Sequence, residues 1–189
     1  MRKLLLPIFT LAVLLTACVP SLQPLYTPET TVFREELIGI WKEKPDDEDS
    51  WTFSKGENNT YNLTLREKDA SSLFEVRLVK LGEHHYLDLF PKGDALEAAK
   101  LGDFYRASLV GGHLIIKVKI AAKLEMQLLQ PEHLDKMLKA DPKILAHTYV
   151  ESDRLVLTAS TADLQAFIKK HADSKELWGD PAVMQKLLL

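Results

Sequence analysis

The fold is decided by residues 61–89, which read YNLTLREKDASSLFEVRLVKLGEHHYLDL. Apolar side chains recur at every second position in three successive runs, the first of which carries Tyr61, Leu63 and Leu65. Successive side chains of a β-strand point to opposite faces, so this period of two predicts strands with one buried face. Gly82-Glu83 has the composition of a tight turn. The stretch therefore predicts neighbouring antiparallel strands.

The same pattern continues on both sides of this stretch. Leu37, Gly39 and Trp41 alternate along one upstream candidate strand, and Trp51-Thr52-Phe53 begins another, which gives a meander of five strands. Leu114 to Ile120 is the clearest strand pattern in the chain. The other downstream strands are expected at 104–110, 124–128, 149–150 and 155–157, the last two as a hairpin.

Four short helices complete the predicted pattern. Pro131 opens one helix, and Ser160 with Asp163 has the spacing of a capping box before another. The other two are expected at 94–101 and after Asp180-Pro181.

Eight to ten short strands joined mostly by tight turns predict a mainly β fold with peripheral helices. We expect an antiparallel up-and-down barrel followed by C-terminal helices. Closure of a barrel removes the exposed edge strands that would otherwise pair with other chains. A β-sandwich is the alternative.

The start of the chain has a different pattern. Arg2 and Lys3 precede an apolar stretch, 4–14, which is typical of an export signal and too short for a transmembrane helix. Leu15-Thr16-Ala17-Cys18 follows and resembles the lipobox of bacterial lipoproteins. In that class the signal peptidase cuts before the cysteine after its thiol has received a diacylglycerol. An ordinary secretory signal beside an unrelated cysteine is the alternative.

The lipobox resemblance implies three parts. These are a signal peptide at 1–17, a lipidated Cys18 with a proline-rich tether at 18–33, and a single domain at 34–189. Prolines spaced by polar residues favour an extended spacer. Leu22, Leu25 and Tyr26 indicate that part of this spacer packs on the barrel.

The residue after the cysteine bears on location. It is Val19, whereas an aspartate would resemble an inner-membrane retention signal in many Gram-negative bacteria. We therefore expect lipid anchoring in the outer membrane with the domain in the periplasm. In a Gram-positive host the domain would lie on the outer face of the cell membrane.

Charge argues against one class of partner. Loss of residues 1–17 removes Arg2 and Lys3, so 22 of the 24 basic residues remain against 27 acidic ones and the net charge becomes −5. A protein with this balance gains little from a phosphate backbone, so nucleic-acid binding is not expected. Cys18 is the only cysteine, which excludes a disulfide within the chain.

Gly39-Ile40-Trp41 on the first expected strand resembles the Gly-x-Trp signature of lipocalins and their calycin relatives. The resemblance implies that Gly39 permits a sharp bend, that Trp41 plugs the closed end of a barrel and that a late arginine, Arg154, stacks on it. Ser21 to Tyr26, Leu37 to Trp41 and Arg154 to Thr161 also resemble a group of uncharacterised bacterial lipoproteins, a resemblance that implies architecture only.

The barrel interior is the expected binding region. A small apolar or amphipathic ligand would be contacted by Trp41, Tyr61, Phe74, Met126 and Tyr149 if the barrel is wide enough to hold one. The alternative is an interaction or structural module whose C-terminal helices contact an envelope protein.

Catalysis is not expected from the sequence. The chain has no Gly-x-Ser-x-Gly nucleophile motif and no glycine-rich phosphate loop, and a hydrolase would have only Ser108 and His113 as candidates. Its six histidines show no metal-ligand spacing. We therefore expect neither a metal nor a cofactor.

Overall fold

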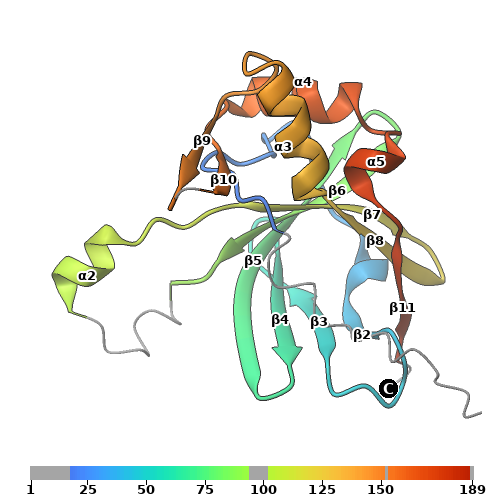
Figure 1. The fold of residues 1–189 in the computed structure, drawn as a ribbon. Helices are drawn as coiled ribbons and strands as arrows, with labels where there is room; N and C mark the ends of the chain where they lie inside the picture. Colours follow the sequence, from blue (N-terminus) through green and yellow to red (C-terminus); the bar gives the residue numbers. More distant parts are fainter. Residues whose placement is uncertain (1–17, 94–101, 152, 188–189) are drawn as a thin grey trace, which may run out of the picture.

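The computed structural model describes residues 18–93, 102–151 and 153–187. The lipobox positions Leu15, Thr16 and Ala17 and the helix expected at 94–101 lie outside the described residues. Figure 1 shows a barrel below and a layer of helices and a small hairpin above it.

Within the described residues, eight antiparallel strands close into a barrel. Seven follow one another around it as a meander, and the last strand of the chain closes the gap between β8 and β2. The mainly β, calycin-like barrel is therefore confirmed, and the pairing of β5 with β6 closes the sheet that a sandwich would leave open. The strands are β2 (Gly39–Lys42), β3 (Ser50–Lys55), β4 (Tyr61–Glu67), β5 (Ala70–Leu81), β6 (His84–Pro91), β7 (Leu114–Ile120), β8 (Lys123–Leu128) and β11 (Ala182–Lys186).

The strand register turns the alternating sequence into one apolar interior. Leu63 lies opposite Phe74, and Leu78 lies opposite Leu87. None of the interior side chains of the buried cluster is more than 8% exposed. The cluster comprises Leu37, Trp41, Phe53, Tyr61, Leu63, Val76, Leu78, Leu87, Leu89, Ile116, Val118, Ile120, Leu124, Met126 and Met184.

A second core covers the outer face of one side of the barrel. Val79, Leu81, Tyr86 and Ile115 point outward from β5, β6 and β7 into it. The covering elements are β9 (His147–Val150), β10 (Arg154–Leu157), α3 (Pro131–Ala140), α4 (Thr161–Lys170) and α5 (Lys175–Trp178). The hairpin and the helices after Pro131 and Ser160 were expected, and Ser160 Oγ accepts the N–H of Asp163 at 3.2 Å as a helix cap.

Two predicted elements are wrong. Residues 104–110 were expected to be extended, but α2 (Asp103–Ser108) is a short helix on an arm (residues 102–113) that projects from the barrel. Within the described residues this arm has no neighbouring strand to pair with, so its backbone groups form the local hydrogen bonds of a helix instead. The helix expected after Asp180-Pro181 is β11, because this segment pairs with both β8 and β2 and buries Met184 in the barrel.

Trp41 is buried in the barrel interior and is 1% exposed. Its Nε1 donates to the carbonyl of Leu37 at 2.8 Å, in the short helix η2 (Glu35–Leu37) that precedes β2. Lys186 Nζ of β11 lies 5.3 Å from the centre of the Trp41 ring. The predicted stacking of Arg154 is wrong, because β10 belongs to the separate hairpin and the strand that reaches Trp41 is β11.

Two features of the structure favour glycine at position 39. Its φ is +135°, and a Cβ at this position would lie 2.6 Å from Cε of Lys186. Gly39→Ala should therefore lower the free energy of unfolding by about 1–3 kcal/mol, because alanine avoids this backbone conformation and displaces Lys186. Urea denaturation followed by tryptophan fluorescence measures the loss.

The matched control is Gly93→Ala, where an added Cβ meets no atom within 4 Å. This substitution should change stability by less than about 0.5 kcal/mol. Equal effects at the two glycines would contradict the role assigned to Gly39.

Candidate functional site

The segment that follows Cys18 is part of the folded domain. Val19 is 4% exposed, and Ser21 and Leu25 are fully buried. The N–H of Ser21 donates to the His113 carbonyl at 2.9 Å, and the N–H of His113 donates back to Ser21 at 2.8 Å. On the other side, the N–H of Leu157 donates to the carbonyl of Pro20 at 2.9 Å. The segment thus runs between the start of β7 and β10.

The side chain of Asp88, on β6, fixes this segment through hydrogen bonds. One carboxylate oxygen accepts the N–H of Leu25 at 2.6 Å, and the other lies 2.6 Å from Nδ1 of His113. A carboxylate only accepts, so Nδ1 of His113 is the donor. Asp88 is 1% exposed, and this buried group connects three parts of the chain that are distant in sequence.

This arrangement differs from the extended spacer expected at 18–33. Leu25 enters the second core, and the guanidinium of Arg77 lies 4.5 Å from the centre of the Tyr26 ring. Thr31 and Val32 form β1 (Thr31–Val32), which pairs with β5. The prolines do not produce a free spacer here because apolar residues between them find buried partners. Leu25 and Tyr26 pack as the sequence indicated, whereas Leu22 is 42% exposed.

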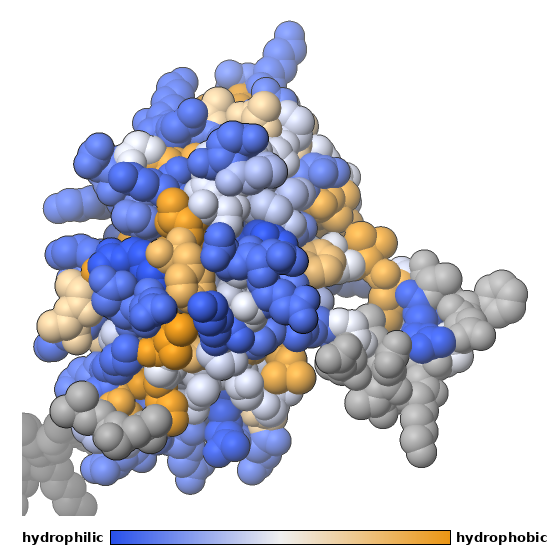
Figure 2. All heavy atoms as spheres, turned by 180° about the vertical axis from the view of Figure 1, so that it is seen from behind, coloured by the Kyte–Doolittle hydropathy of each residue, from blue (hydrophilic) through white to orange (hydrophobic). Residues whose placement is uncertain are grey.

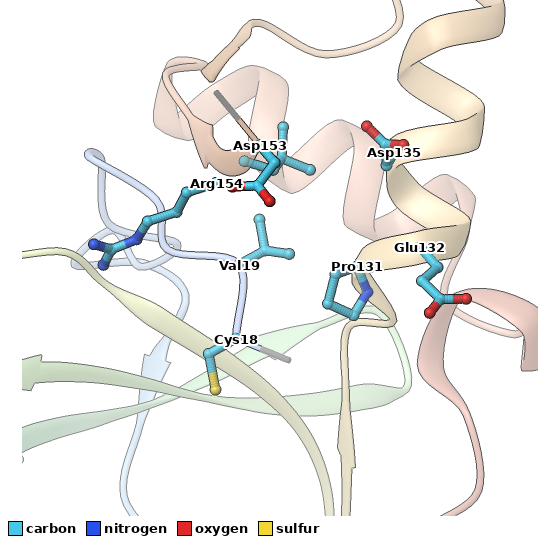
Figure 3. Close-up of a pocket in the computed structure, with 8 residues that line it drawn as sticks. Cys18, Val19, Pro131, Glu132, Asp135, Asp153 and Arg154 are labelled. Atoms are coloured by element: carbon cyan, nitrogen blue, oxygen red, sulfur yellow. The ribbon is translucent and has the colours of Figure 1, made fainter. Parts of the chain in front are cut away.

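Cys18 is exposed at the edge of a pocket of about 220 Å³. Figure 3 shows Cys18 and Val19 between the β9–β10 hairpin and the first turn of α3. Pro131 occupies the first turn of α3, where its missing N–H costs no hydrogen bond. The lining residues besides Cys18 are Val19, Pro131, Glu132, Asp135, Asp153, Arg154 and Leu155.

The pocket combines charges of both signs. Glu132, Asp135 and Asp153 supply carboxylates, and Arg154 supplies a guanidinium. Hydrogen bonds from Lys139 Nζ at 2.6 Å and from the Tyr149 hydroxyl at 2.8 Å lower the pKa of Asp135, so it remains an anion. This set can position a polar group next to Cys18.

The five residues predicted to contact a ligand do not all come together. Trp41, Tyr61 and Met126 are buried in the barrel interior, and Phe74 packs against the same cluster. Tyr149 lies outside the barrel on β9, is 37% exposed and donates to Asp135. It belongs to a different sheet because β9 pairs with β10 alone.

Side chains occupy the space around Tyr61. Its ring stacks on Phe33 with 4.7 Å between centroids and meets the edge of Phe53 at 6.4 Å. The Tyr61 hydroxyl accepts the N–H of Arg34 at 2.6 Å. The aromatic residues of the interior are thus engaged with one another and with the backbone.

Ser108 and His113 are not brought together as a catalytic pair. The Ser108 hydroxyl donates to the Tyr105 carbonyl at 2.6 Å, whereas His113 bonds to Asp88. No hydrogen bond joins the two side chains in the described part of the chain. Among the described residues, no group of three or more His, Cys, Asp or Glu side chains could hold a metal ion.

Asp88 was missed by the sequence analysis. It lies between Leu87 and Leu89, where an alternating strand would present a polar residue to solvent. A hint was available in the pairs Tyr86-Leu87 and Ile115-Ile116, since two adjacent apolar residues put one on each face. Both faces of β6 and β7 are in fact covered.

The chain matches no protein-family model, no curated protein and no solved structure. In the parts that the structure describes, no helix combines the length and the apolar character needed to cross a membrane.

Replacement of Asp88 tests whether it holds the N-terminal segment. Asp88→Ala should lower the free energy of unfolding by about 3 kcal/mol, because it leaves the N–H of Leu25 and Nδ1 of His113 buried without an acceptor. Urea denaturation gives the loss, and amide hydrogen exchange should show faster exchange at Leu25.

Asp173→Ala is the matched control. Asp173 is 85% exposed and pairs with His84 at 3.1 Å, so its loss should cost less than about 0.5 kcal/mol. A small effect of Asp88→Ala, similar to that of the control, would show that the segment is held by its apolar contacts instead.

Proposed function

We propose that this protein is a lipoprotein of the bacterial envelope whose lipid is attached to Cys18. The observation that carries the proposal is the lipobox Leu15-Thr16-Ala17-Cys18 together with the position of its cysteine. Cys18 is exposed, and Val19 directly after it is already buried. The described domain thus begins directly after the cysteine that would carry the lipid.

The proposed location follows from Val19 and from the number of acyl chains. Two acyl chains on one cysteine give stable anchoring, which a single chain does not. Without an aspartate after the cysteine, the outer membrane is the proposed membrane, with the barrel in the periplasm. In a Gram-positive host the same anchor would hold the barrel on the outer face of the cell membrane.

The proposed role of the barrel is that of a non-enzymatic interaction or structural module. The interior of the described barrel is lined by buried apolar side chains that contact one another, which favours a contact through the outer surface. Leu164, Phe167 and Ile168 of α4 are buried in the second core, so a partner would not bind through these three side chains. Binding of a small apolar ligand inside the barrel stays a prediction, with less support from this geometry.

Lipid attachment is tested by Cys18→Ser in the full chain, expressed in a bacterium and separated into membrane and soluble fractions. The unchanged chain should sediment with the membranes after washes with high salt, and the serine variant should become soluble. Intact mass of the membrane-bound form should fit a chain that starts at Cys18 and carries acyl groups. An unmodified mature cysteine would refute the proposal.

The role of the barrel is tested by native mass spectrometry of the protein extracted gently from its own membrane. We expect the mass of the lipidated chain alone, because the described interior is occupied by side chains. A small molecule that co-purifies and is released on unfolding would favour the carrier function over the interaction module.

A further inference from the structure

We propose that the face of the domain around Cys18 rests on the lipid bilayer and inserts apolar side chains between the lipid head groups. This inference depends on the proposed lipid at Cys18 and goes further, because it assigns an orientation and a second membrane contact. Three observations support it.

The first observation is that Cys18, the residue proposed to carry the lipid, adjoins the folded domain directly, without a flexible spacer. Val19 is 4% exposed, and Ser21 is fully buried with backbone hydrogen bonds to His113 of the arm, while its neighbours Pro20 and Leu22 bond to Leu157 of β10. One residue of chain spans at most about 3.6 Å. A lipid on Cys18 would therefore hold the adjoining surface against the head groups, with no spacer to lift it away.

The second observation is the distribution of exposed apolar side chains. Nine large ones are exposed among the described residues, and Val183 on β11 is the exception to their clustering. The other eight lie on the N-terminal segment, on the β9–β10 hairpin, or on the arm (residues 102–113) and the strands at its root. They are Leu22, Leu73, Phe90, Tyr105, Leu109, Val110, Tyr149 and Val150.

These three segments meet beside Cys18. At the root of the arm, His113 pairs with Ser21, and a Cβ added to Gly112 would lie 2.9 Å from Cβ of Pro20. From the other side, Asp153, Arg154 and Leu155 of the hairpin line the pocket that Cys18 borders (Figure 3). Figure 2 shows hydrophobic residues continuing from the body onto the root of the arm. Exposed apolar side chains gathered in this way mark a contact surface more often than scattered ones do.

The third observation is the net negative charge of the chain, which argues against an electrostatic contact with the membrane. The chain that follows residue 17 has a net charge of −5, so anionic lipids would not attract it. Beside Cys18, the single guanidinium of Arg154 lies among three carboxylates. The proposed contact therefore relies on apolar side chains at the level of the head groups, as in proteins that lie in the membrane interface. The lipid anchor makes such a weak contact effective because it keeps the surface next to the bilayer.

Single introduced cysteines test the orientation. The only natural cysteine would be blocked by its lipid, so Val110→Cys and the control Val183→Cys each provide one reactive thiol. Val110 is 78% exposed and Val183 is 40% exposed, so neither change disturbs the core. The lipidated full-length variants are labelled with an environment-sensitive dye and placed in phosphatidylcholine vesicles that contain nitroxide-labelled acyl chains.

The dye at position 110 should shift to shorter wavelength and be quenched roughly threefold more than the dye at 183, because only the former lies within the 5–10 Å depth of the interface. Val150→Cys on the hairpin should behave like Val110→Cys. Equal and weak quenching at all three sites, with the lipid present by intact mass, would overturn the bilayer contact and leave the lipid anchor standing.

Two further outcomes are distinct from these. An unmodified Cys18 by intact mass would overturn the proposed function together with this inference. Shielding of position 110 in native envelope membranes, but not in protein-free vesicles, would overturn the bilayer contact and show that a membrane protein covers this face.

Discussion

The buried carboxylate of Asp88 is the interaction on which the N-terminal organisation of this protein depends. It accepts hydrogen bonds from the backbone of Leu25 and from the ring of His113, and so it fixes the segment after Cys18 against the barrel and the root of the arm. A buried carboxylate without donors would be strongly unfavourable, so the segment and the barrel wall require each other. The position of Cys18, one residue before this packed segment, follows from that requirement. What would otherwise be a proline-rich spacer becomes a structural part of the domain.

The barrel serves here as a scaffold with two cores. Its interior is closed by β11, which returns from the far end of the chain to pair with β2 and β8. The chain between β8 and β11 forms α3, the hairpin, α4 and α5, and these cover the outer face of β5, β6 and β7. Because those strands are apolar on both faces, the barrel and its cover are stabilised together. The remaining exposed surface is therefore divided unevenly, with polar strand faces on one side and the arm, the hairpin and Cys18 on the other.

This division gives the proposed lipoprotein a defined geometry. In the proposed orientation, a lipid at Cys18 and the exposed apolar residues of the arm lie on the same face. The pocket beside Cys18 carries charges of both signs and suits the polar boundary between lipid and water. A structural or interaction role at the membrane is consistent with each of these features.

Much of the barrel followed from the sequence, because a period of two is a local property of each strand. The meander from β2 to β8, the hairpin and the helices at Pro131 and Ser160 could all be predicted, and the lipobox is likewise a local pattern. Other features required long-range contacts. Residues 182–186 form a strand because the edges of β2 and β8 present backbone groups with which this segment pairs. The local sequence of the segment does not indicate that these two distant strands will lie beside it. Lys186, and not Arg154, lies over Trp41 because the closing strand is β11. Asp88 looked like a solvated position until Leu25 and His113 covered it. The sequence by itself thus determined most of the barrel strands and the pattern that resembles a lipobox, whereas the tertiary structure decided the closing strand β11, the second core and the surroundings of Cys18, because these depend on partners that only folding brings together.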